Sequence, residues 1–138
     1  MCRWHVFAIL MALGTLVTCS SGCAARGKAQ QQREDRYQAA LASYSEVLKP
    51  GMTRKEVEDY LRAKNVTFEH IIGHGLDDPG PWADLIRIGH EHHPWYCEAH
   101  NVYVAIHFTK TEPHDNYQAF DSDAVKKLTI FHWLEGCL

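Results

Sequence analysis

The sequence predicts an α+β fold in which two N-terminal helices pack on an antiparallel sheet of three or four strands. Three observations lead to this prediction. Apolar residues recur at helical spacing over residues 37–48, and a helix-capping pattern stands at residues 53–56. The remaining chain alternates runs rich in β-branched and aromatic residues with turn-forming segments. Residues 37–138 are enough for one domain with one core.

The first helix of that domain is predicted from a single apolar stripe that ends at Pro50-Gly51. The stripe contains Tyr37, Ala40, Leu41, Tyr44, Val47 and Leu48.

The second helix begins at a capping box. The Thr53 hydroxyl can accept the backbone amide of Glu56, whose side chain can reach back to the amide of Thr53. Met52 and Val57 flank the cap as a hydrophobic staple. Asn65 suits a left-handed helix end. The buried face of this helix is expected to carry Val57, Tyr60 and Leu61.

Strands are predicted over residues 66–72, 85–88, 102–108 and 125–133. A symmetric hairpin of the last two sets Val104 opposite Ile130 and Ile106 opposite Leu128 on one face, with Tyr103 opposite Phe131 on the other. The same register sets Cys97 opposite Cys137. Because a cysteine pair in an exported protein is expected to be oxidised, we predict a disulfide between them.

The first 25 residues have the pattern of an export signal. Arg3 precedes an apolar run from Trp4 to Val17, and small residues follow up to Ala25. The run is shorter than the roughly 20 residues of a bilayer span, which disfavours a retained anchor. Residues 1–25 are therefore predicted to be a signal peptide, and the polar residues 26–36 a tether or the frayed start of a helix.

Two routes of processing stay open at this leader. Cys19 and Cys23 each end a segment that resembles the lipidation signal of bacterial lipoproteins. Lipidation of either cysteine would attach the protein to a membrane of the cell envelope. Ordinary cleavage after Ala25 would instead release a periplasmic or secreted protein.

The segment Leu48–Leu61 resembles the signature of the BamE/SmpA-type lipoprotein domain, whose fold is shared with the β-lactamase-inhibitor-like repeat. Its Gly51-Met52-Thr53, Val57 and Leu61 carry the resemblance. The resemblance implies two helices on a small antiparallel sheet, in an envelope protein that binds other envelope proteins or peptidoglycan-associated partners and does not catalyse. Here Arg62-Ala63-Lys64-Asn65 stands where the family usually has Gly-x-Pro, so the helix exit differs.

Charge and motifs exclude several classes of function. The chain has 14 Lys and Arg against 17 Asp and Glu, which argues against a nucleic-acid partner. It has no phosphate loop, no Ser-His-Asp order and no dinucleotide fingerprint, so no cofactor is expected. Cys97 could act as a nucleophile with His100 as its base, but a disulfide with Cys137 would remove the free thiol that this needs. The chain is therefore not expected to be an enzyme.

Histidine is the compositional oddity, with 10 in the chain and the densest run at His90-Glu91-His92-His93. If that run is extended, His90 and His92 share a face and His93 points away. Pro94 stands where a metalloprotease motif needs its second histidine. The alternative function is that of a periplasmic metal-binding protein that uses His90 and His92. The other interpretation of this run is a set of loop histidines that are exposed to solvent and bind no metal.

Aromatic residues in predicted loops point to the leading function. Trp82, Trp95 and Tyr96 are of the types that anchor protein interfaces, although they could instead fold back over a sheet edge. The sequence therefore predicts a non-catalytic, envelope-associated binding or assembly module with envelope proteins as partners.

Overall fold

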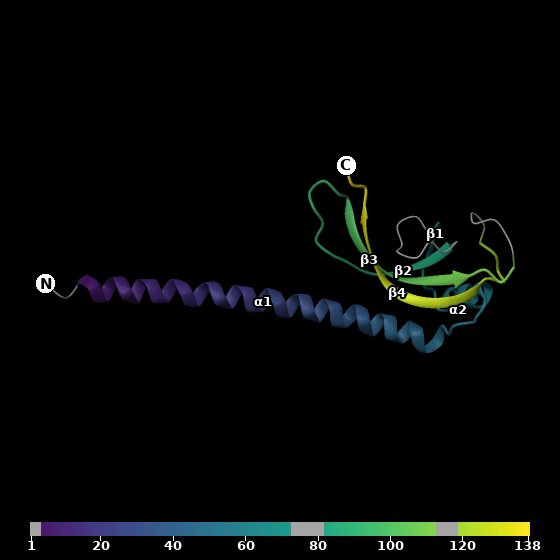
Figure 1. Ribbon diagram of the computed structural model, residues 1–138, viewed down its shortest axis with the longest axis horizontal. Coiled ribbons are helices and arrows are strands. Elements are labelled where there is room, and N and C mark those ends of the chain that lie inside the picture. Colours follow the sequence, from purple (N-terminus) through teal and green to yellow (C-terminus); the bar gives the residue numbers. More distant parts are fainter. Residues whose placement is uncertain (1–3, 73–81, 113–118) are drawn as a thin grey trace. The chain divides into compact units, whose positions relative to one another are not determined.

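The computed structural model describes residues 4–72, 82–112 and 119–138, with side chains described from residue 26 onward except at 72 and 82 (Figure 1). The chain divides into two compact units at the junction of Arg36 and Tyr37. Helix α1 (Trp4–Val47) provides the first unit and contributes its last turns to the second.

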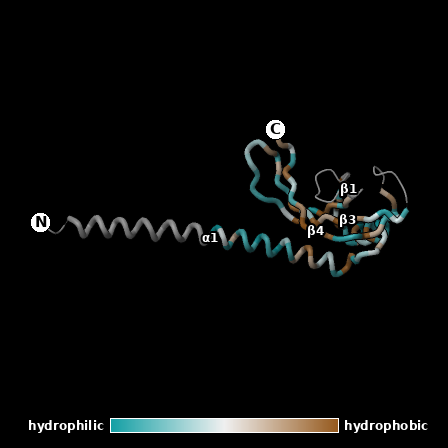
Figure 2. Tube along the Cα trace, viewed as in Figure 1, coloured by the Kyte–Doolittle hydropathy of each residue, from teal (hydrophilic) through white to brown (hydrophobic). Residues whose placement is uncertain are grey.

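The first unit is helical from Trp4 onward. Residues 26–36, expected to be a tether or a frayed helix start, belong to the same helix and are mostly exposed. Figure 2 shows this stretch as largely hydrophilic. Within the part of the chain that the structure describes, no helix has the length and apolar character that a membrane crossing needs.

The second unit has the predicted α+β architecture. In its described residues, helix α2 (Arg54–Ala63) precedes the sheet, whose four antiparallel strands lie in the order of the chain. The strands are β1 (Glu69–Ile72), β2 (Trp82–His90), β3 (Ala99–Thr109) and β4 (Ala124–Glu135). The predicted fold class is confirmed.

The main core lies between the helices and one face of the sheet. Leu48 of the connecting segment and Val57 and Leu61 of α2 pack with strand residues including Val104 and Ile106. Val47 departs from the predicted stripe and is 41% exposed. The buried position that follows Tyr44 is taken by Leu48, which is 1% exposed, and Val47 lies at the edge of the stripe.

The start of α2 forms as predicted. The Thr53 backbone amide donates to Glu56 Oε2 at 2.8 Å, and the Glu56 amide donates to the Thr53 hydroxyl at 3.3 Å. Asn65 ends the helical segment with a φ of 55°. The cap also joins the helix to the sheet, because the Arg54 amide donates to the Asp123 carbonyl at 2.7 Å.

The predicted register of the last hairpin is confirmed. Val104 pairs with Ile130 and Tyr103 with Phe131, and the two pairs belong to different apolar clusters on opposite faces. The Cys97–Cys137 disulfide is present. It fastens the chain just before β3 to the chain just after β4.

The first two strands differ from the prediction. Pairing in β1 begins at Glu69 and not at Val66, which instead packs on the main core with Phe68. Strand β2 extends beyond 85–88 in both directions because it pairs with β3 as far as His90, past a bulge between Arg87 and Gly89. The chain therefore leaves β2 after His90, two residues later than the predicted strand end at residue 88.

Candidate functional site

An exposed aromatic turn lies at the disulfide-linked end of β3 and β4. Trp95 is 91% exposed and contacts Tyr96 edge to face, with ring centroids 5.9 Å apart. The Leu138 amide donates to the Tyr96 carbonyl at 3.0 Å, and the Cys97 amide donates to the Pro94 carbonyl at 3.0 Å. These bonds and the disulfide fix the backbone that carries the two aromatic rings.

The predicted interface residues are thus brought together in part. Trp95 and Tyr96 present large apolar surface to solvent, together with the fully exposed Leu138. The backbone of Trp82 lies at the start of β2, and its side chain lies outside the described residues.

A cluster of two imidazoles and one carboxylate lies near the same end of the sheet. Glu91 Oε2 is 3.8 Å from His100 Nδ1 and 3.9 Å from His132 Nδ1. One potential ligand atom from each of the three side chains lies within 4.8 Å of the others. Glu91 and His100 are partly buried, and His132 is more exposed and contacts the Tyr37 ring edge to face.

A cavity of about 510 Å³ opens beside this cluster. Glu91 and His100 line it, with Arg87, His90 and Glu98 among the other lining groups. Strand β1 pairs with β2 only as far as Leu85, and β2 continues to His90. The cavity lies along this last part of β2, where β1 no longer covers its edge. The cluster is therefore reachable from solvent.

The predicted ligand pair, His90 and His92, lies outside both ligand clusters of the described residues. His90 ends β2, whereas His92 follows the strand and its ring stacks on His93 with centroids 6.2 Å apart. The face shared by His90 and His92, with His93 pointing away, was expected only for an extended run, and residues 91–94 are not part of a strand. From the run of residues 90–93, Glu91 is the residue that belongs to a ligand cluster, together with His100 and His132.

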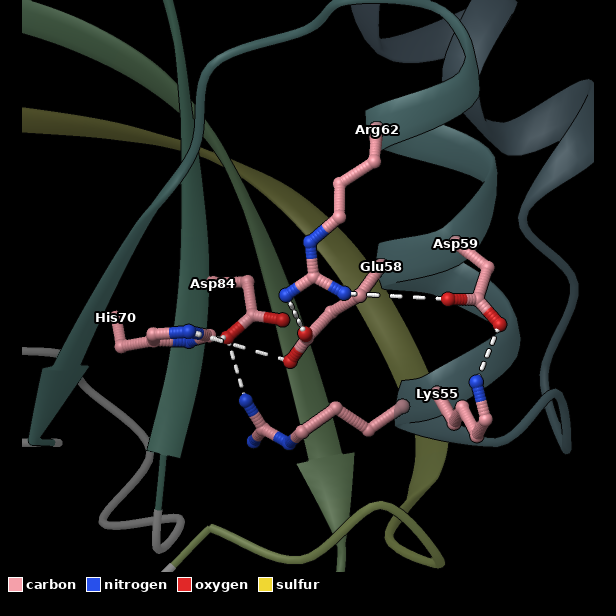
Figure 3. A network of polar contacts seen from close by, with 7 residues as sticks. Lys55, Glu58, Asp59, Arg62, His70 and Asp84 are labelled. Carbon is pink, nitrogen blue, oxygen red and sulfur yellow. Dashed lines mark hydrogen bonds and ion pairs between the residues drawn. The ribbon is translucent and has the colours of Figure 1, made fainter.

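A second polar network joins α2 to β1 and β2 (Figure 3). Arg54 Nη1 lies 2.5 Å from Asp84 Oδ1, and both side chains are buried. His70 Nδ1 lies 2.8 Å from the same oxygen, and His70 Nε2 lies 3.9 Å from Glu58 Oε1. Burial raises the pKa of Asp84, while the Arg54 guanidinium and His70 act in the opposite direction.

The Arg54 network is structural in character. The Arg54 guanidinium also lies over the Phe108 ring, 3.9 Å from its centroid, in the middle of the main core. The permanently charged Arg54 guanidinium is already paired with the Asp84 carboxylate, which a metal ion would need as a ligand. The network therefore docks α2 on the sheet.

The opposite face of the sheet carries a third polar group of residues. The Tyr103 hydroxyl donates to Glu135 Oε1 at 2.7 Å, and Asn101 Nδ2 donates to the same oxygen at 2.9 Å. Burial and the hydrogen bond to Glu135 raise the pKa of Tyr103 to about 12. On this face His107 Nε2 lies 2.8 Å from Thr129 Oγ1, so His107 is a structural histidine that does not meet His132.

The Glu91 cluster was missed by the sequence analysis although part of its signal was present. His100 and His132 lie on one face in the predicted hairpin register, two positions apart across the strands. Glu91 could be added only by knowing how β2 pairs with β3, and that pairing includes a bulge.

No protein-family model matches the chain, and neither the curated proteins nor the solved structures contain a match to it.

Proposed function

We propose that this chain is an exported, non-catalytic binding module of the cell envelope whose partner is another envelope protein. The observation that carries the proposal is Trp95, which is 91% exposed on a turn held by the Cys97–Cys137 disulfide. Tryptophan and tyrosine dominate the binding energy of many interfaces. A turn that is already fixed loses little conformational freedom on binding, which favours affinity.

The resemblance of Leu48–Leu61 to the BamE/SmpA-type domain supports the same proposal, since those domains act by binding in the envelope. The matching residues include the cap of α2, which is a folding device. The proposal therefore takes from the family its compartment and its mode of action, and takes no particular partner from it.

The leader decides how the module is held in its compartment. In this proposal the leader is removed during export, with cleavage just before Cys19 or Cys23 when that cysteine carries a lipid, and after Ala25 when no lipid is added. Intact-mass measurement of the mature protein distinguishes these forms by the first residue and by the added acyl mass. Cys19→Ala and Cys23→Ala, made separately, identify the acceptor, and a mature chain that starts after Ala25 without lipid identifies the released form.

Site-specific photocrosslinking tests the binding function directly. A photoreactive amino acid replaces Trp95 in one variant and Phe120 in the other, in cells that export the protein. Phe120 is a matched control because it is an exposed aromatic residue, 39% exposed, on a different part of the chain. We expect one defined envelope protein to crosslink from position 95 and not from position 120.

Affinity measurement with the purified partner completes the test. Trp95→Ala is expected to weaken binding by about 30-fold or more, the effect of a hot-spot residue. Phe120→Ala is expected to leave the affinity unchanged. The proposal is wrong if neither position crosslinks to an envelope protein, or if Trp95→Ala binds the captured partner as tightly as the wild type does.

A further inference from the structure

Two strand positions and the residue that follows β2 bring His100, His132 and Glu91 to one place. The Glu91 amide donates to the His100 carbonyl at 2.8 Å, which continues the β2–β3 pairing one residue beyond His90. His132 on β4 pairs with Val102, two residues from His100, so both histidines lie on one face of the sheet. The positions of the three side chains are therefore set by the sheet.

The three groups lie somewhat farther apart than ligands bound to one metal ion. The 3.8 Å and 3.9 Å separations from Glu91 Oε2 to the two imidazole nitrogens exceed direct hydrogen-bond distances. Ligands bound tetrahedrally to zinc at about 2.1 Å lie about 3.4 Å from one another. Side-chain rotation that shortens the two Glu91 separations by about 0.5 Å would bring each imidazole nitrogen to that distance from Glu91 Oε2. The ligand atoms of the two imidazoles, which lie within 4.8 Å of one another, would also have to approach each other.

We propose that Glu91, His100 and His132 form a binding site for a divalent transition-metal ion of the zinc class. Imidazole nitrogens suit zinc and its neighbours, whereas magnesium and calcium prefer sites made of oxygen ligands alone. Two histidines and one carboxylate leave the fourth tetrahedral position for water or another ligand. The cavity lined by Glu91 and His100 gives that position access to solvent, with Arg87 as the basic residue along its wall.

The Glu58–His70–Asp84 cluster provides an internal comparison. It also holds three candidate ligand atoms within 4.8 Å of one another. However, Arg54 Nη1 lies 2.5 Å from Asp84 Oδ1, and this fixed positive charge opposes the approach of a cation. The described residues therefore offer two clusters of suitable ligand types, of which the Glu91 cluster is the one proposed to bind metal.

Zinc titration of the purified mature protein, from its processed first residue to Leu138, tests the site. After removal of metal with a chelator, isothermal titration with Zn²⁺ is expected to show one ion bound per chain, and titration with Mg²⁺ none. Glu91→Gln and His132→Gln are each expected to weaken zinc affinity by more than about tenfold, since changes to outer-shell groups alone cost about 10–100-fold. Two controls, the double variant His90→Gln/His92→Gln and the single variant His70→Gln, are expected to bind zinc as the wild type does.

Imidazole signals in the NMR spectrum of the wild type provide a second readout that does not depend on a variant folding. Zinc is expected to shift the ring signals of His100 and His132 and to leave those of His70 and His107 in place. The proposal is overturned if the wild type binds no stoichiometric zinc. It is also overturned if the His90/His92 variant loses zinc while Glu91→Gln and His132→Gln, folded by circular dichroism, retain it.

Discussion

Arg54 and Asp84 form a buried ion pair between the first turn of α2 and strand β2, with Nη1 and Oδ1 2.5 Å apart and side chains only 2% and 0% exposed. The two residues are 30 positions apart in the chain. His70 also contacts Asp84, and the Phe108 ring lies under the Arg54 guanidinium. Their interaction links α2 to the sheet beside the apolar contacts of Val57 and Leu61.

The first prediction is that Asp84→Ala strongly destabilises the protein. Removing one partner leaves the Arg54 guanidinium buried without its counter-charge, and such changes cost about 3–5 kcal/mol. The free energy of unfolding in urea measures the loss. Replacing both partners with apolar residues, as Arg54→Met/Asp84→Leu, is expected to cost less than Asp84→Ala alone, because no charge then remains buried.

Lys55 and Asp59 supply the control for that experiment. They form an ion pair on the same helix, but both side chains are more than half exposed. Lys55→Met is therefore expected to change the free energy of unfolding far less than Asp84→Ala does. If Asp84→Ala proves as mild as Lys55→Met, the Arg54 pair does not hold the helix to the sheet.

The second prediction concerns stability at high pH. The pKa of Tyr103 is raised to about 12 by burial and by its hydrogen bond to Glu135, whereas an unfolded tyrosine titrates near 10. Between these values the unfolded chain loses the proton that the folded chain keeps. The free energy of unfolding therefore falls by up to about 1.4 kcal/mol per pH unit as pH rises above about 10, and Tyr103 adds no pH dependence below that.

Tyr103→Phe is expected to flatten this alkaline slope, measured by urea denaturation at a series of pH values. The variant also loses the hydrogen bond to the Glu135 carboxylate, so its stability at neutral pH is expected to fall by about 1.5–3 kcal/mol. Tyr96→Phe, at a tyrosine that is 44% exposed, is the matched control. An unchanged slope in Tyr103→Phe would assign the alkaline loss to other groups.

The third prediction is that the Cys97–Cys137 disulfide stabilises the second unit by about 2–4 kcal/mol, because it closes a loop of 40 residues in the unfolded chain. The Cys97→Ala/Cys137→Ala variant and the reduced wild type are expected to unfold at similarly lower urea concentrations. A reduced protein as stable as the oxidised one would show that hydrogen bonds around the turn already hold this end of the hairpin.

The elements with local signals could be predicted from the sequence. The cap of α2 depends on residues three positions apart, Thr53 and Glu56, and forms as expected. The β3–β4 register was predicted from a symmetric hairpin connection, which matches Val104 and Ile106 with apolar residues of β4 and brings Cys97 to Cys137. These features need no knowledge of distant parts of the chain.

The features that could not be predicted depend on distant pairing. Asp84 falls outside the predicted strand because a carboxylate in an apolar run argues against burial, and only the approach of Arg54 makes its burial tolerable. Glu91 joins His100 and His132 through the β2–β3 pairing, whose register is displaced by the bulge at Arg87 and Gly89. An apolar pattern carries no information about such a displacement.

The last prediction tests the contact between Tyr37 and the sheet. A Cβ atom at Gly89 would lie 2.7 Å from Tyr37 Cε1, and the Tyr37 side chain is only 5% exposed, so its ring has little room to move. Gly89→Ala is therefore expected to lower the free energy of unfolding by about 1–3 kcal/mol through overpacking. Gly27→Ala is the control, because nothing lies within 4 Å of its added Cβ and alanine favours a helix.

In a Tyr37→Ala background the cost of Gly89→Ala is expected to disappear, since the clashing ring is gone. If the cost of Gly89→Ala stays the same in both backgrounds, it arises from the bulged backbone of β2, and the Tyr37 ring does not press on the sheet at this position.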